Sequence, residues 1–500
     1  MVDLSNLTNY PHECVNIISS NNSATVLIVD LDGTLSPTDT LVESVIQLIK
    51  KTPANLLKLP FWLLKGRAAF KKEVASQTQI SVKYLPYNES FLNYLRSEKK
   101  KGRRIILATA THQSIAEGVS AHLGLFDSVL STGTGHNLKG KVKLEAIQQT
   151  VGEEFVYAGD SRADIPIWKA AKAAVLVGVP AGLSESIRQY VPIEQEFPKE
   201  NVGLSIWLRA FRVHQWLKNL LLFVPLLTTF SFMEIEKLTT MMVAFLAFSF
   251  TASATYIIND LWDLENDRAH PRKRLRPFAS AKIPILHGLA VVGSSLALAF
   301  VLALTVSQNF FLILLLYFVL TSTYSWVLKE YVLIDVLMLS FLYTLRILAG
   351  SVAIGVTTSS WLLAFSLLMF FSLALVKRCS ELVSLEQSGI EATRGRDYRV
   401  SDLVILWPLG VGAALSAVVV FGLFISVPET QVRYAVPHLL WFVAIGLVYW
   451  LTRLWIKTSR GEMHDDPVIY AIKDHASRLT VFAMIATMMV AHFLVLDTVL

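Results

Sequence analysis

Cysteine and charged residues are scarce in this chain. Cys14 and Cys379 are the only cysteines among 500 residues, which excludes a disulfide framework, and neither stands in a metal-ligand spacing. Charged residues make up 17%, whereas soluble proteins carry about 25%. This deficit excludes a wholly soluble chain as well as disorder and coiled coil. Residues 1–23 are polar and lack an apolar core, so no signal peptide is expected.

The composition changes near residue 200. Before that point, short apolar and branched runs alternate with helical patterns, which is typical of a parallel α/β sheet. These runs cover 24–30, 104–109, 155–160 and 173–179. After that point, long runs carry no charge. We therefore expect two domains, a Rossmann-like α/β domain over 1–200 and an all-helical membrane domain over 205–500.

The second domain has room for about nine membrane spans, because a spanning helix needs about 20 apolar residues. One charge-free run, 283–328, is long enough for two spans that turn near Ser307. The expected spans lie at about 207–232, 238–258, 284–304, 310–328, 333–353, 360–377, 404–426, 434–452 and 479–497.

Lys and Arg are distributed unevenly between the connections of these spans. One face has only Lys237 and Arg433. The other face has seventeen Lys and Arg residues, in the connections 260–283, 329–332, 377–403 and 453–478. Because basic loops stay in the cytoplasm, we expect a multi-pass protein of the cell (inner) membrane, with a cytoplasmic N-terminal domain and the C-terminus on the opposite face. These loops explain the net charge of +6, so no nucleic acid partner is expected.

Carboxylates follow two of the apolar runs in the first domain. Asp30 and Asp32 are separated by one residue, and Gly33 lets the turn swing both groups into the crevice where α/β sheets bind ligands. Asp160 and Asp164 follow a later run. A capping turn is the structural alternative for the Asp-x-Asp-Gly segment alone.

Four motifs in order resemble the haloacid dehalogenase superfamily, specifically its phosphatase branch, over about 24–185. They are Asp30-Leu31-Asp32-Gly33-Thr34, Thr109, Lys143 in NLKGKVK, and GDSRAD with Asp160 and Asp164. The resemblance implies that Asp30 is a nucleophile that forms an aspartyl-phosphate. It implies that Asp32 acts as general acid and then as general base.

The same resemblance implies a Mg²⁺ site. Asp30, Asp160 and the backbone carbonyl of Asp32 would hold the ion, and Asp164 would support them. Lys143 and Thr109 would neutralise and orient the phosphoryl oxygens.

The region 36–103, between the first two motifs, is expected to form a small helical cap that selects the substrate. Within it, 55–72 is apolar, aromatic and basic together. This segment is either part of the cap's core or an interfacial helix that meets a lipid head group.

In the membrane domain, Asn259 and Asp260 abut a charge-free run and are followed by Asp263 and Asp267. On a helix these three carboxylates share one face. Because carboxylates clustered at an embedded helix end repel each other unless a cation lies among them, the pattern favours a Mg²⁺–polyphosphate site. A solvated acidic loop is the alternative.

This segment resembles the first Asp-rich motif of the UbiA prenyltransferase superfamily. The string Asp-Arg-x-His-Pro-x-Lys-Arg-x-Arg-Pro at 267–277 is similar to the decaprenyl-phosphate phosphoribosyltransferase branch. Further segments that resemble that branch lie at 212–227, 324–336, 346–350 and 375–382. The resemblance covers about 205–500.

The resemblance implies transfer of 5-phosphoribose from phosphoribosyl pyrophosphate to a polyprenyl phosphate in the bilayer, with release of pyrophosphate. Asp260, Asp263 and Asp267 would hold Mg²⁺ on the pyrophosphate. The residues expected to contact the substrates are Asn259, Arg268, His270, Lys273, Arg274, Arg276, Lys218, Lys329, Asp335, Arg346, Lys377 and Arg378. Arg346 is the strongest candidate among them, because a single charged residue inside a membrane span is first interpreted as a functional residue. Snorkelling is the alternative for Lys377 and Arg378.

The second Asp-rich motif of the wider superfamily is reduced here to Glu330 and Asp335. This departure counts against a second carboxylate-bound Mg²⁺ and against a prenyl-diphosphate donor. The later segment 460–474 adds another acidic pair, Asp465 and Asp466, which is better interpreted as part of a solvated loop.

Together the two resemblances suggest two consecutive reactions. The membrane domain would make a polyprenyl-phosphoryl-5-phosphoribose, and the phosphatase would remove its 5-phosphate. Two alternatives remain. One is an aromatic or glycerol-phosphate prenyltransferase joined to a phosphatase of separate specificity, and the other is a non-catalytic lipid-binding scaffold.

Overall fold

The computed structural model describes residues 25–133, 137–199, 202–389, 396–463 and 466–494. The chain divides into two compact units, Met1–Asn201 and Val202–Leu500. We call them the hydrolase unit and the membrane unit, and we describe each one separately.

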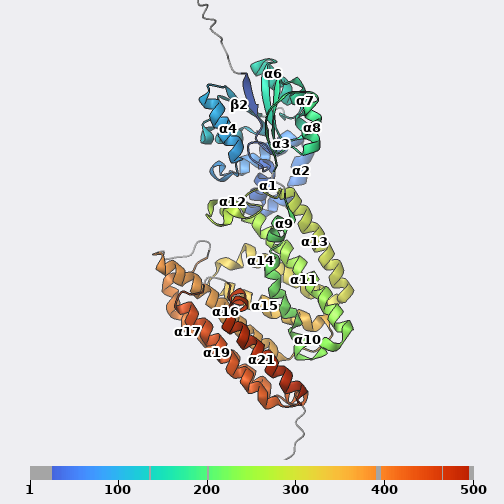
Figure 1. The fold of residues 1–500 in the computed structure, drawn as a ribbon, viewed down its shortest axis with the longest axis vertical. Coiled ribbons are helices and arrows are strands. Elements are labelled where there is room, and N and C mark those ends of the chain that lie inside the picture. The colour runs from blue at the N-terminus through green and yellow to red at the C-terminus, as the bar shows by residue number, and fades with distance from the viewer. Residues whose placement is uncertain (1–24, 134–136, 200–201, 390–395, 464–465, 495–500) are drawn as a thin grey trace, which may run out of the picture. The chain divides into compact units, whose positions relative to one another are not determined.

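The hydrolase unit is built on a six-stranded parallel sheet with the order β3-β2-β1-β4-β5-β6 (Figure 1). The strands are β1 (Val26–Val29), β2 (Ile105–His112), β3 (Ser128–Thr132), β4 (Phe155–Gly159), β5 (Ala173–Val177) and β6 (Ile193–Phe197). The four apolar runs of the sequence form β1, β2, β4 and β5. The two edge strands were not predicted, because their polar composition lacks the continuous apolar pattern of a buried parallel strand.

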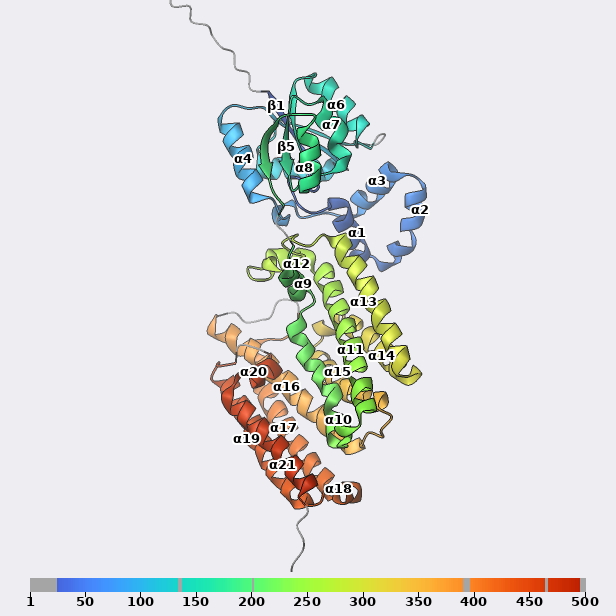
Figure 2. The same ribbon diagram turned by 45° about the vertical axis from the view of Figure 1, so that its right-hand side comes forward.

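Helices cover both faces of this sheet (Figure 2). Because side chains of a strand alternate between faces, Leu27 and Val29 pack on one side and Ile28 on the other. The first side is covered by α4 (Glu89–Lys100) and α5 (Gln113–Leu123). The second side is covered by α6 (Lys141–Val151), α7 (Ile165–Ala170) and α8 (Ala181–Arg188).

The segment between β1 and β2 supplies a helical cap, which is smaller than the expected range of 36–103. Its helices are α1 (Thr40–Lys51), η1 (Pro53–Leu57), α2 (Leu59–Leu64) and α3 (Arg67–Gln77). The short helix η2 (Val82–Tyr84) follows them and packs against α5. The last helix of the range, α4, buries Phe91 and Leu95 in the core beneath the sheet. It therefore belongs to the sheet layer rather than to the cap.

The membrane unit contains, within its described residues, eight helices that are long and apolar enough to cross a membrane. The chain is therefore a multi-pass membrane protein. These helices are α11 (Ile235–Trp262), α13 (Ile285–Val306), α14 (Gln308–Trp326), α15 (Ile334–Ala353), α16 (Ser360–Gln387), α17 (Leu403–Ser426), α19 (Leu440–Ser459) and α21 (His475–Phe493). Shorter helices are α12 (Leu264–Ala269), η6 (Lys273–Leu275), η7 (Leu328–Glu330), η8 (Val400–Asp402), α18 (Pro428–Arg433), η9 (Pro437–Leu439) and α20 (Pro467–Lys473). In both views α17, α19 and α21 lie side by side (Figures 1 and 2).

The segment 207–232, which the sequence predicts as the first of nine spans, is not a continuous helix. It folds as α9 (Leu204–Ala210), the 3₁₀ helix η4 (Val213–Phe223), α10 (Val224–Thr228) and η5 (Ser231–Met233). Two breaks coincide with left-handed backbone, at Arg212 (φ 50°) and Phe230 (φ 54°), which interrupts right-handed helices. A third coincides with Pro225, which has no N–H to extend the preceding helix.

This broken segment packs very closely against α15. The backbone carbonyl oxygen of Leu222 in η4 lies 2.0 Å from the place that a Cβ on Gly350 would occupy. Only glycine therefore permits the contact. The approach joins the start of the unit to the centre of α15 and brings Asn219 within 3.0 Å of Arg346.

We expect Gly350→Ala to destabilise the membrane unit by about 1–3 kcal/mol, because the added methyl group would force the two backbones apart. Gly293→Ala is the matched control, since Gly293 lies in α13 with no atom within 4 Å of its missing Cβ. Thermal unfolding of each detergent-solubilised variant gives its melting temperature for comparison with that of the wild type. Equal melting temperatures for the two variants would contradict the close packing.

Candidate active sites in the two units

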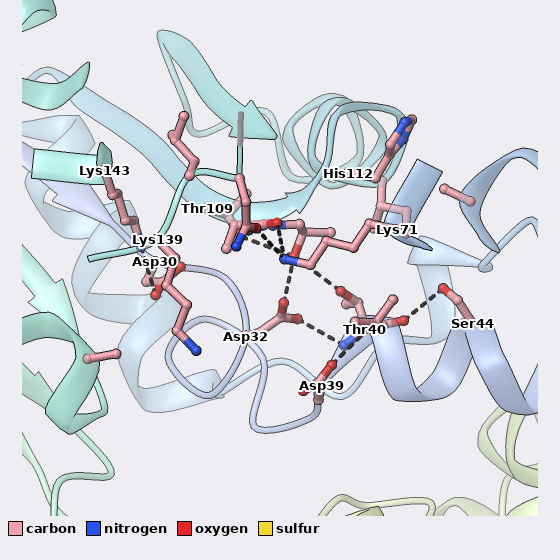
Figure 3. A pocket seen from close by; sticks show the side chains of 18 of the residues that line it. Asp30, Asp32, Asp39, Thr40, Ser44, Lys71, Thr109, His112, Lys139 and Lys143 are labelled. Atoms are coloured by element: carbon pink, nitrogen blue, oxygen red, sulfur yellow. Dashed lines mark hydrogen bonds and ion pairs between the residues drawn. The ribbon is translucent and has the colours of Figure 1, made fainter. Parts of the chain in front are cut away.

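The candidate site of the hydrolase unit lies at the carboxyl ends of the central strands. The strand order turns between β1 and β4, and ligands of open α/β sheets bind at such a point. Asp30 follows β1, Thr109 lies in β2 and Asp160 follows β4. These residues line a cavity of about 420 Å³, which is drawn in Figure 3. The structure thus brings together the residues of all four predicted motifs, including Lys143.

A group of three carboxylates in this cavity could hold a metal ion. Oxygens of Asp30, Asp160 and Asp164 all lie within 4.8 Å of one another, the one such group among the described His, Cys, Asp and Glu residues. Gly33 (φ +82°) leaves them room, because a Cβ there would lie 2.2 Å from Asp160 Oδ2. Asp164 is fixed by the N–H and hydroxyl of Ser161, each at 3.1 Å. An all-oxygen group of this kind fits Mg²⁺.

Lys143 provides a buried cation beside the predicted nucleophile. Its Nζ lies 2.8 Å from Asp30 Oδ2 and donates to the hydroxyl of Tyr157 at 2.7 Å. Tyr157 in turn donates to Asp164 Oδ1 at 2.8 Å. Burial, with the charge of Asp164, raises the pKa of Asp30, and Lys143 opposes this shift. Burial and the neighbouring carboxylates raise the pKa of Asp160 to about 7.

Asp32 is held in a network of threonine hydroxyls. Its Oδ2 accepts a hydrogen bond from Thr111 Oγ1 at 2.6 Å, and its Oδ1 accepts one from the N–H of Thr40 at 3.0 Å. Thr109 reaches this network through Thr111, at 3.1 Å. Burial, with the charge of Asp39, raises the pKa of Asp32 to about 6. A carboxyl group with this pKa can both give and take a proton near neutral pH.

Three further residues that the sequence motifs do not predict contribute to this cavity. Tyr157 and Thr111 lie on strands next to predicted motifs, and that proximity was the available signal. The third is Lys71 of α3, whose Nζ donates to the carbonyl of Ala110 at 2.7 Å and to Asn137 Oδ1 at 2.9 Å (Figure 3). Lys71 therefore adds a cation from the cap to the wall of the cavity.

In the membrane unit, the three carboxylates of the Asn-Asp motif are paired with cations. Asp260 is buried at the end of α11, where it forms ion pairs with Arg212 and, at 3.1 Å, with Arg276. Arg276 also contacts Asp267, at 2.5 Å. Asp263 contacts Lys329 at 3.1 Å. Arg212 was not among the predicted site residues.

The structure therefore places Arg276 between two of the carboxylates that the sequence assigns to Mg²⁺. The three do not form a group within 4.8 Å of the kind that Asp30 forms. The physical reason is that a buried carboxylate is stable only with a nearby opposite charge. The donor oxygens still fit a hard cation chemically, and a Mg²⁺–pyrophosphate complex carries both charges needed to replace these pairs.

A second charged group joins the ends of other helices. Asp335 is fully buried, at 2.5 Å from both Arg378 Nε and the hydroxyl of Tyr398. Arg378 also contacts Glu381 at 2.6 Å. Both oxygens of Asp335 therefore accept hydrogen bonds from protein groups, Oδ2 from Arg378 and Oδ1 from Tyr398.

Contrary to what its sequence context predicts, Asp466 does not lie in a solvated loop. Its side chain is only 12% exposed and contacts Lys218 at 2.9 Å and Lys377 at 3.5 Å. It is therefore not part of a solvated loop, because two predicted substrate-binding lysines meet on it. Asp465 lies outside the described residues.

Arg346 is buried and bound to protein atoms. Its guanidinium donates to Asn219 Oδ1 at 3.0 Å, to the carbonyl of Leu342 at 2.7 Å and to the hydroxyl of Tyr317 at 2.8 Å. Arg346 therefore ties η4, α14 and α15 together, and the structure does not place it among the carboxylates of the Asn-Asp motif.

The other predicted residues surround that motif. Arg268 is buried and donates to the carbonyl of Ala279 at 3.0 Å. His270 Nδ1 accepts a hydrogen bond from the N–H of Arg272 at 3.2 Å. Lys273 and Arg274 are exposed in η6, and Asn259 is half-buried at the end of α11.

Comparisons with known proteins assign a family to each unit. Residues 27–169 match the haloacid dehalogenase-like hydrolases, and residues 221–469 match the UbiA prenyltransferase family. A UbiA homolog from Archaeoglobus fulgidus solved with GPP and Mg²⁺ gives a TM-score of 0.43 at 16% identity, over 57% of this chain and 99% of that chain.

Three curated proteins resemble the chain over most of their own length. The uncharacterized protein y4nM of Sinorhizobium fredii is 38% identical, over 90% of this chain and 88% of that protein. The nodulation protein NoeC of Azorhizobium caulinodans is 35% identical, over 57% of this chain and 92% of that protein. The decaprenyl-phosphate phosphoribosyltransferase of Mycobacterium tuberculosis is 30% identical, over 58% of this chain and 95% of that protein. This chain is thus a member of the UbiA prenyltransferase family that carries a haloacid dehalogenase-like hydrolase domain in its N-terminal part.

Proposed function

We propose that the chain is a bifunctional membrane enzyme. Its membrane unit transfers 5-phosphoribose from phosphoribosyl pyrophosphate to a polyprenyl phosphate and releases pyrophosphate. Its hydrolase unit then removes the 5-phosphate and leaves polyprenyl-phosphoryl ribose. The similarity to decaprenyl-phosphate phosphoribosyltransferases supports the first reaction, and the Asp30 cavity supports the second.

The observation that carries the transferase proposal is the interleaving of carboxylates and cations in the membrane unit. Arg212, Arg276 and Lys329 lie against the Asn-Asp motif. Lys218 and Lys377 converge separately on Asp466. The donor carries a pyrophosphate and a separate 5-phosphate. The pyrophosphate needs metal-binding oxygens with cations beside them, and the 5-phosphate needs a further group of cations.

This arrangement favours the phosphoribosyl donor over a prenyl diphosphate. Asp335, one of the two carboxylates left in the second motif, is already neutralised by Arg378. A second metal bound there would have to displace a buried guanidinium, which is costly. The scaffold alternative is less favourable, because a binding module needs neither the nucleophile Asp30 nor the oxygen group around it.

In the hydrolase unit we assign the bond changes as follows. Asp30 attacks phosphorus while the bond to the ribose oxygen breaks, and Asp32 gives its proton to that oxygen. Asp32 then takes a proton from the water that releases phosphate from Asp30. Lys143 and Thr109 neutralise and orient the phosphoryl group. Asp30, Asp160 and the carbonyl of Asp32 would hold Mg²⁺, with Asp164 in support. The bound ion would neutralise the charge of the phosphoryl oxygens.

We further propose Mg²⁺ as the ion that accompanies the donor at Asp260, Asp263 and Asp267. The uneven distribution of Lys and Arg supports insertion in the cell (inner) membrane, with the hydrolase unit in the cytoplasm and the C-terminus on the opposite face.

Thr111→Val should lower phosphatase turnover about 10- to 100-fold without abolishing it, because one hydrogen bond to a charged group contributes about 1.5–3 kcal/mol. The substitution keeps the side-chain shape but removes the donor to Asp32. The rate of p-nitrophenyl phosphate hydrolysis by the full chain measures the effect. Thr150→Val is the control, since Thr150 is exposed and its hydroxyl donates to the carbonyl of Ala146 in its own helix. Unchanged turnover in Thr111→Val would remove Thr111 from the positioning of Asp32.

Asp30→Asn should abolish phosphatase turnover but leave phosphoribosyl transfer intact. The membrane should then accumulate a lipid heavier by one phosphate than the wild-type product, as read by mass spectrometry. Asp260→Ala should do the opposite. It should make no new lipid, because a ligand of the donor's metal is lost, and it should still hydrolyse a supplied phosphoribosyl lipid.

Glu265→Ala is the control for Asp260→Ala, because Glu265 is an exposed carboxylate close by in the same sequence. It should leave transfer unchanged. If wild type and Asp30→Asn give lipid products of the same mass, the phosphatase acts on another substrate and the two-reaction proposal fails.

A further inference from the structure

The tip of the cap exposes large apolar side chains. Leu57 is 75%, Phe61 68% and Leu64 85% exposed, and Leu56 and Leu63 beside them are more than half exposed. We call these five residues of η1 and α2 the cap tip. No residue of α2 is buried, so this helix does not form the core of the cap. Contiguous exposed apolar surface of this kind marks a site of interaction.

The cap tip lies in a segment with charge of one sign. Lys51, Lys58 and Lys65 are exposed within or beside it. No Asp or Glu occurs between Glu43 and Glu73. Apolar side chains flanked by lysines match the interface of a membrane with anionic head groups, because the leucines enter the acyl boundary and the lysines remain among the phosphates.

The cap tip is also continuous with the catalytic cavity. Leu63 of α2 and Phe70 of α3 line the same cavity as Asp30. Lys71, next to Phe70, borders this cavity and donates to Ala110 in β2. One wall of the cavity is therefore apolar and leads from the nucleophile to the exposed leucines. A substrate with a phosphate at one end and a hydrocarbon chain at the other would fit this polarity.

We propose that the cap tip inserts into the anionic interface of the bilayer and that the hydrolase unit takes its phosphate monoester from a lipid rather than from solution. The hydrolase unit is joined in one chain to helices that are long and apolar enough to cross a membrane. The identity of the lipid rests on the function proposed above, whereas the insertion of the cap tip does not.

Site-directed fluorescence on the full chain tests the insertion. Cys14 is replaced by Ser, and Cys379, which is buried, is left in place. Leu64→Cys carries an environment-sensitive dye, and Tyr190→Cys, a 58% exposed aromatic position after α8, is the matched control. The protein is placed in nanodiscs of phosphatidylglycerol and phosphatidylcholine that contain a doxyl-lipid quencher.

We expect the dye at position 64 to be quenched at least two-fold more than the dye at position 190. We expect weaker quenching at position 64 in discs of phosphatidylcholine alone. Equal quenching at the two positions would overturn the proposal and would indicate that protein, such as a second copy of the chain, covers the cap tip. Equal quenching at position 64 in the two lipid compositions would overturn the role of the lysines.

The triple variant Leu57→Ser/Phe61→Ser/Leu64→Ser tests the consequence for catalysis, since none of these three side chains lines the cavity. It should hydrolyse p-nitrophenyl phosphate within about two-fold of the wild-type rate. It should remove phosphate from the lipid made by its own membrane unit at least ten-fold more slowly. Equal rates on that lipid for the variant and the wild type would overturn the proposal.

The two proposals can fail separately. If the wild type forms no phosphoribosyl lipid, the proposed function fails, and the quenching at position 64 still decides whether the cap tip enters the bilayer. If the lipid forms but position 64 is not quenched, the proposed function stands and the cap-tip proposal falls.

Discussion

A charge that leaves water must find an opposite charge close by, and both units of this chain are organised around that requirement. In the hydrolase unit, Asp30, the proposed nucleophile, lies against the buried Lys143. In the membrane unit, Asp335 lies against Arg378, and Asp260 lies against two arginines. These pairs fix the ends of helices and strands that are distant in sequence. The groups to which we assign a function in each site are therefore also the groups that hold that site together.

The same requirement limits what each site can bind. A ligand that enters a paired site must supply charges equivalent to those it displaces. Under the proposed function, a metal ion with a phosphate would do so, because the cation would replace Arg276 at Asp260 and Asp267 and the anion would receive the released guanidinium. A neutral ligand, or a metal ion alone, would leave one charge unpaired. The charges around Asp260 thus support the metal–pyrophosphate donor that we propose.

Joining the two units in one chain has a further physical effect. A lipid that carries a phosphoribosyl group stays in the membrane, so the enzyme that acts next must reach it there. Covalent linkage raises the effective concentration of the second site, and an apolar cap tip around Phe61 would let that site approach the interface. Hydrolysis of the 5-phosphate would then draw the transfer reaction toward product.

The sequence alone determined the units, four of the six strands, the long helices and the position of each acidic motif, because hydropathy and strand-end carboxylates are local properties of the chain. Only the tertiary structure decided which charges meet. Thr111 binds Asp32 and Arg212 binds Asp260 across long stretches of sequence. Asp466 becomes a partner of two lysines instead of a solvated residue, and the segment 207–232 becomes a chain of short helices packed on Gly350. Each of these outcomes depends on a neighbour that folding brings close, and no pattern within a single segment encodes that neighbour.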